Sequence, residues 1–243
     1  MTYNALYSNM EGTSFLPAFL VVSSASTFII SYVTAVLRGD IDVIFPYISD
    51  TGAEPPESCI FGLLTSLTAI ASLATMYARY KFIERLIDRT GGMRPCVNKA
   101  GLLFGLLSCF GMCVVATFQE TVVVVVHDLG ALLFFVTGVI YICIQTYISH
   151  RAHPYGSSKA MCRIRTGISL LALLALIPTV VCALLVGKTK LHWNGDEKDY
   201  GFRLASAVCE WTVAFSFVFF FLTYIRDFKL FTLTVRAELV EQD

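Results

Sequence analysis

Long apolar runs separated by short polar segments dominate the pattern of this 243-residue chain. Six runs lack aspartate, glutamate, lysine and arginine, apart from Glu210 in the last of them. Each has about 20 residues, and a helix that rises about 1.5 Å per residue then crosses a hydrocarbon layer about 30 Å thick. We therefore predict six transmembrane helices, at residues 15–37, 58–78, 100–118, 129–150, 166–187 and 204–225.

The fourth helix is expected to begin earlier than its charge-free run, within the segment ETVVVVVHD, because five consecutive valines are too apolar to lie in water. Valine suits a strand, but a lone strand in lipid leaves its backbone groups unpaired. The chain is 56% hydrophobic and 15% charged, more apolar than the roughly 45–50% of a soluble domain. The fold class is therefore an all-α polytopic membrane protein, a six-helix transmembrane bundle over residues 15–225.

Basic residues indicate the orientation of the bundle. Thirteen of the 18 lysines and arginines fall on the side that holds both termini, and five fall on the other side. The excess of positive charge marks the cytosolic side, so both termini are predicted to be cytosolic, with a leader at residues 1–14 and a tail at residues 226–243. The leader has no lysine or arginine, which favours a retained first helix over a cleaved signal peptide.

The loop FPYISDTGAEPPES, residues 45–58, then faces the lumen or the exterior. Its prolines restrict the backbone, and in the SDTG turn Asp50 is expected to accept bonds from nearby amides while Gly52 takes a positive φ. The loop is either a structural lid over the bundle or a binding surface for a headgroup, a cation or a lumenal partner. Its candidate residues are Pro46, Asp50, Thr51, Gly52, Pro55, Pro56 and Glu57.

Three ionisable residues form a candidate intramembrane polar cluster: His127, Asp128 and Glu210. Such groups are costly in a membrane, and pairing Glu210 with His127 or Asp128 would avoid an isolated charge. Because histidine titrates near neutral pH, one hypothesis is that the cluster senses or conducts protons. The other is a structural hydrogen-bond network.

Several sequence blocks occur in a characteristic order: PYISDTG followed by PPE, ATMYARY, LSCFGM with FQE, HDLGALL, HWNGDEKDY, and CEWTVAF with FFLTYIRDF. Together they span nearly the whole chain and resemble the damage-regulated autophagy modulator (DRAM) family. The resemblance implies a multi-pass protein of the lysosomal membrane, and in part of other endomembranes or the plasma membrane. It also implies a role in promoting autophagy under stress and in linking autophagy to cell death.

Catalytic signatures are lacking from the sequence. It contains no phosphate-binding glycine loop, nucleophile elbow or metalloprotease pattern, and topology separates His150 and His153 from His127 and His192. We therefore expect no enzyme activity, no cofactor, no metal and no nucleic acid. The expected partners are membrane lipids and unidentified autophagy or lysosomal membrane proteins. A non-enzymatic regulator and a protein that binds or transports lipid or a small solute both remain open.

Two features of the predicted cytosolic side concern delivery and membrane attachment. The loop at residues 80–99 is either an interfacial basic helix or an extension of the second transmembrane helix. Cys96, within this loop, is a candidate for S-palmitoylation, as is Cys162. The N-terminal tetrapeptides YNAL and YSNM fit a tyrosine-plus-bulky-apolar sorting pattern. Their candidate sorting residues are Tyr3, Leu6, Tyr7 and Met10.

Overall fold

The computed structural model describes residues 13–187 and 190–233, which are mainly helical and contain no strand. Six of their helices are long and apolar enough to cross a membrane, which confirms the predicted fold class. The sorting candidates Tyr3, Leu6, Tyr7 and Met10 lie outside the described residues. The six helices are α1 (Phe15–Arg38), α2 (Glu57–Thr90), α3 (Pro95–Thr117), α4 (Val124–Ala152), α5 (Lys159–Leu185) and α6 (Tyr200–Leu222).

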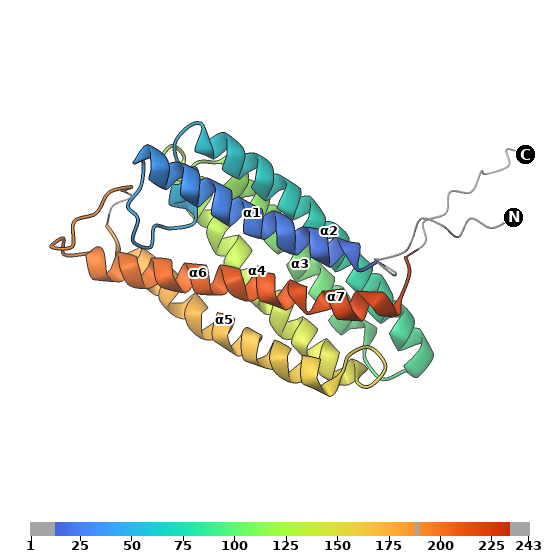
Figure 1. Cartoon of the computed structure of the whole chain (residues 1–243). Coiled ribbons are helices and arrows are strands. Elements are labelled where there is room, and N and C mark those ends of the chain that lie inside the picture. The colour runs from blue at the N-terminus through green and yellow to red at the C-terminus, as the bar shows by residue number, and fades with distance from the viewer. Residues whose placement is uncertain (1–12, 188–189, 234–243) are drawn as a thin grey trace, which may run out of the picture.

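The helices pack as a closed ring in chain order (Figure 1). Each helix contacts its neighbours in sequence, and α1 closes the ring against α6. An even number of crossings brings the first and last described residues to one end, which we call the terminal end. The opposite end carries residues 39–56, 118–123, 186–187 and 190–199, and we call it the lid end.

The helix boundaries settle two points that the sequence left open. Helix α4 begins at Val124, inside the valine run, as predicted. Helix α2 continues without a break to Thr90, where Gly91 ends it with a φ of 62°. The basic segment after the second apolar run is therefore an extension of that helix rather than a separate interfacial helix.

After α6 the chain does not leave the bundle at once. The short helices α7 (Tyr224–Asp227) and η2 (Phe228–Leu230) follow, and both Tyr224 and Phe228 are fully buried in the core. Thr13, ahead of α1, lies with its hydroxyl 3.5 Å from the carbonyl oxygen of Phe228. The start of the predicted C-terminal tail is thus part of the packed structure.

Helices α3 and α4 approach each other closely because glycine lines the seam between them. A Cβ added at Gly111 would lie 2.5 Å from the backbone nitrogen of Phe134, and one at Gly130 would lie 2.5 Å from the side chain of Val114. Only residues without a side chain allow this spacing, as is usual between membrane helices.

Candidate functional site

The loop after α1 is a lid that is tied to α6 by buried polar contacts. The Asp50 carboxylate accepts a hydrogen bond from the Tyr47 amide at 2.8 Å, as predicted, and pairs with Arg203 at 3.2 Å. The Glu210 Oε2 atom accepts the Ile48 amide at 3.1 Å. Asp50 and Arg203 are at most 1% exposed, so these contacts hold the lid in a fixed position over the bundle.

Further contacts join the lid to α1, α2 and the segment before α6. The buried Thr51 hydroxyl donates to Ser31 of α1 at 3.1 Å. Asp42 accepts the Trp193 amide at 2.7 Å. Glu57 is the first residue of α2 and is fully buried, 3.4 Å from the guanidinium of Arg38.

The three prolines of the lid differ in burial. Pro46 is buried, and its carbonyl oxygen accepts a hydrogen bond from the Trp211 indole at 2.8 Å. Pro55 and Pro56 are exposed at the turn into α2.

The prediction for Gly52 was wrong. Its φ is not positive; the residue belongs to the short helix η1 (Ser49–Gly52). Glycine is needed there for space, because a Cβ at this position would lie 2.4 Å from the ring of Phe61 on α2. The close contact between lid and helix is a tertiary feature, which the turn-like sequence SDTG does not reveal.

A cavity of about 510 Å³, the lid-end cavity, lies beneath the lid between α4, α5 and α6. The predicted polar cluster lines it, with His127 and Glu210 buried and Asp128 exposed. The His127 Nδ1 atom is 2.7 Å from the Phe118 carbonyl oxygen. Within the described part of the chain no hydrogen bond or ion pair links the three residues, so they share a cavity without pairing.

Glu120 also lines the lid-end cavity, and the sequence reasoning did not single it out as a site residue. It lies in the connection between α3 and α4. Burial raises the pKa of its carboxyl above the ordinary value, and the nearby His127 and a hydrogen bond with Ser49 oppose this rise. Burial likewise raises the pKa of the Asp50 carboxyl, which the Tyr47 amide and Arg203 oppose. At this end of the bundle, burial thus disfavours a carboxylate that has no positively charged or hydrogen-bonding partner.

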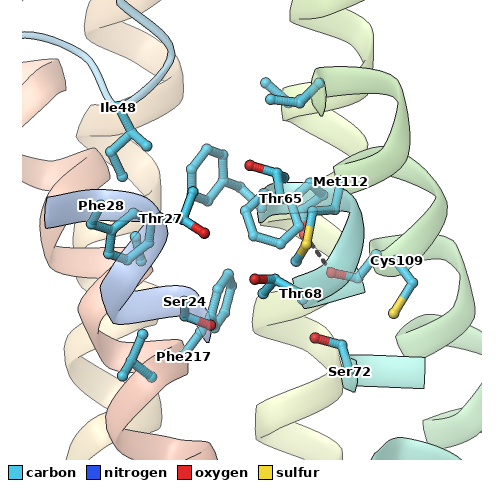
Figure 2. Close-up of a pocket in the computed structure, with 18 of the residues that line it drawn as sticks. Ser24, Thr27, Phe28, Ile48, Thr65, Thr68, Ser72, Cys109, Met112 and Phe217 are labelled. Atoms are coloured by element: carbon cyan, nitrogen blue, oxygen red, sulfur yellow. Dashed lines mark hydrogen bonds between the residues drawn. The ribbon is translucent and has the colours of Figure 1, made fainter. Parts of the chain in front are cut away.

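A second cavity, the inner cavity, has a volume of about 100 Å³ and lies inside the helix ring. Figure 2 shows hydroxyl side chains of α1, including Ser24 and Thr27, facing Thr65 and Thr68 of α2 across it. Most of these hydroxyls donate to carbonyls of their own helix, as Ser24 does to Leu20 at 2.8 Å. His127 and Glu210 are among the residues that line both cavities, together with Ser49, Ala131 and Phe135.

The terminal end holds another buried ionic cluster. Asp227 pairs with Arg79 at 3.2 Å and with Arg165 at 2.8 Å, and it accepts the Ser157 hydroxyl at 2.8 Å. All of these side chains are at most 3% exposed, and each guanidinium carbon lies 5.0 Å from the ring centre of Tyr224.

Arg79 and Arg165 are two of the thirteen basic residues that the sequence analysis counted on the side of the termini, and the structure shows that both are buried rather than exposed in loops. Both lie at the edges of apolar runs, and that was the available signal for a buried partner.

The palmitoylation candidates differ in access, since Cys96 is exposed while Cys162 is buried and its thiol donates to the Ser149 carbonyl oxygen at 3.2 Å. Of these two cysteines, only Cys96 has a thiol that is accessible for acylation.

Metal ligands do not gather anywhere in residues 13–187 and 190–233: no group of three histidine, cysteine, aspartate or glutamate side chains could hold an ion there. The site instead combines a fixed lid, buried ion pairs and two cavities that meet at His127 and Glu210. Such an arrangement can bind a small molecule.

These features define a six-helix membrane protein with a lidded cavity between its helices. The family model described as the Frag1/DRAM/Sfk1/Cwh43P N-terminal domain matches residues 12–231, and the chain belongs to this family. The sequence resemblance to the DRAM family is thereby confirmed.

Several relatives share nearly the full length. DNA damage-regulated autophagy modulator protein 1 of Homo sapiens is 49% identical over 95% of this chain and 97% of its own. DNA damage-regulated autophagy modulator protein 2 of Mus musculus is 40% identical over 94% of this chain and 88% of its own. Modulator of macroautophagy TMEM150B of Danio rerio is 30% identical over 94% of this chain and 92% of its own. No solved structure matches the chain.

Proposed function

We propose that this chain is a multi-pass protein of the lysosomal membrane that modulates autophagy and stress-linked cell death without catalysis. The observation that carries the proposal is the 49% identity, over 95% of this chain and 97% of the relative, to a protein named as a DNA damage-regulated autophagy modulator. The lidded, six-helix architecture fits a membrane-embedded regulator.

The proposed regulator acts through its terminal end, which faces the cytosol in this scheme. Arg85, Arg89 and Arg94 are exposed at the end of α2 and in the turn before α3. They differ from Arg79 of the same helix, which is buried and pairs with Asp227. Exposed arginines on a rigid helical extension suit a cytosolic partner protein or an anionic membrane surface.

The alternative function, binding or transport of lipid or a small solute, is favoured by a different observation. The lid-end cavity of about 510 Å³ is within the size of ordinary ligand pockets. In that case the buried residues of the cavity, and not the exposed arginines, would carry the activity.

One rescue experiment separates the two functions. Autophagic flux is measured in cells that lack the protein and that regain, at equal lysosomal levels, wild type, Glu210→Gln or a variant with Arg85, Arg89 and Arg94 changed to glutamine. The regulator function predicts rescue by Glu210→Gln and failure of the arginine variant. The opposite pattern would favour the binding or transport function, and full rescue by both variants would contradict each of them.

A further inference from the structure

The lid-end cavity has two chemically distinct walls. One is apolar and is formed by α4 and α5, including Leu129, Leu132 and Leu184. These three leucines are exposed on membrane-spanning helices, so the cavity borders the surface that lipid chains contact. The other wall carries Glu120, Asp128, Glu210 and His127. An amphiphile is the class of molecule that fits such a pair of walls.

The polar wall offers hydrogen-bond acceptors. His127 Nδ1 faces a carbonyl oxygen at 2.7 Å and must donate to it, which leaves Nε2 of the neutral ring as an acceptor. Glu210 uses Oε2 to accept the Ile48 amide, and Oε1 has no partner among the described residues. The Glu120 Oε2 atom is buried and has no hydrogen bond within the same residues. Three acceptor atoms thus remain available, two of them on side chains that are at most 7% exposed.

Three of the donors that line the same cavity are engaged with other groups, and the Ser49 hydroxyl bonds to Glu120. The Lys190 ammonium pairs with Glu197 at 2.5 Å, the Ser206 hydroxyl donates to the Thr179 carbonyl at 2.7 Å, and the Trp193 indole donates to the Lys190 carbonyl at 2.8 Å. A ligand headgroup that brings its own donors would therefore complete the wall, whereas a phosphate or carboxylate would meet more acceptors.

The charges of the residues that line the cavity also favour a ligand that brings hydrogen-bond donors. Arg203 pairs with Asp50, and its charge also acts on Glu120 and Glu210. One guanidinium therefore faces several acids, and no basic side chain among the described residues lies within ion-pair distance of Glu120, Asp128 or Glu210. A carboxylate beside hydrocarbon is costly without a counter-charge. An ammonium group supplies positive charge and up to three N–H donors with no acceptor.

We propose that the lid-end cavity binds a single-chain amphiphile with a protonated amine headgroup, which donates to Glu210, Glu120 and His127 while its hydrocarbon chain lies along the apolar wall of α4 and α5. This inference goes beyond the proposed function and does not depend on it. Zwitterionic phospholipids with an amine are disfavoured, because their phosphate would lie close to the same carboxyl groups.

The test uses the full chain in lipid nanodiscs and a photoreactive long-chain primary amine with a diazirine in its chain. Peptide mass spectrometry is expected to find the label in residues 124–132 and 180–187. Dodecylamine should compete with the probe, while dodecanol and dodecanoate should not. Glu210→Gln and Glu120→Gln should each weaken competition by dodecylamine roughly tenfold or more, as expected for the loss of a charge-assisted hydrogen bond.

Glu54→Gln is the matched control, because Glu54 is an exposed acid of the same lid that does not line the cavity. It should leave labelling unchanged. Glu120→Gln provides a second variant, at a residue that lies in a connection rather than in a transmembrane helix. Equal competition by dodecanol, equal effects of Glu54→Gln and Glu210→Gln, or labelling confined to α1 and α2 would each overturn the proposal. Competition by dodecyltrimethylammonium as strong as by dodecylamine would overturn the role of the N–H donors.

Discussion

Neutralising Asp227 tests whether the buried ionic cluster stabilises the terminal end of the bundle. The carboxylate lies 3.2 Å from Arg79 and 2.8 Å from Arg165, in a region that is at most 3% exposed. Asp227→Asn retains the size of the side chain and an oxygen that can accept the Ser157 hydroxyl. The substitution therefore removes the negative charge while it leaves the shape of the core nearly unchanged.

The expected cost follows from the two guanidinium groups that would remain. Loss of one partner from a buried ion pair costs about 3–5 kcal/mol, because the other charge stays buried without compensation. The Tyr224 ring, 5.0 Å from each guanidinium carbon, still stabilises both arginines in the variant. We therefore expect the free energy of unfolding to fall by about 3 kcal/mol, the lower end of that range.

The assay is unfolding of the purified protein from mild detergent micelles by increasing SDS, followed by circular dichroism. Asp88→Asn is the matched control, because Asp88 is 62% exposed and lies 4.0 Å from Arg85 on the surface of α2. Such an exposed pair contributes about 0–1 kcal/mol. A loss below about 1 kcal/mol for Asp227→Asn, equal to that of Asp88→Asn, would refute the reasoning.

Three further predictions concern the lid, pH and delivery. Gly52→Ala places a Cβ 2.4 Å from the Phe61 ring and should lower the free energy of unfolding by about 1–3 kcal/mol; an unchanged SDS midpoint would contradict the overpacking. The raised pKa of Glu120 means that its contribution to stability is fully present below the ordinary glutamate pKa and is lost as pH rises through the folded-state value. Wild type should thus gain stability as pH falls from 7 toward the ordinary glutamate pKa, measured by the same SDS titration, and a Glu120→Gln variant with an equal gain would contradict this. The double variant Tyr3→Ala, Tyr7→Ala should shift the protein to the plasma membrane by fluorescence microscopy, and unchanged lysosomal location would exclude these tyrosines as sorting signals.

Much of the fold could be predicted because the lipid phase imposes a simple rule on sequence. Apolar runs of about 20 residues can cross a bilayer only as helices, and the six expected runs are the six long helices of the structure. The early start of α4 at Val124 followed from the same rule. The amide bond accepted by Asp50 was also predicted, because short-range turn chemistry depends on neighbours in sequence.

The sequence by itself thus determined the number, the type and the approximate bounds of the membrane helices, together with an ordered acidic loop. Tertiary structure alone decided which charges meet: Arg203 finds Asp50 across 153 positions of chain, and Arg79 finds Asp227 across 148. It also decided that Gly52 is needed for space rather than for a left-handed turn. The physical reason is that hydropathy records whether a residue meets lipid or water, whereas partners depend on how each helix is rotated and on which neighbour it packs against.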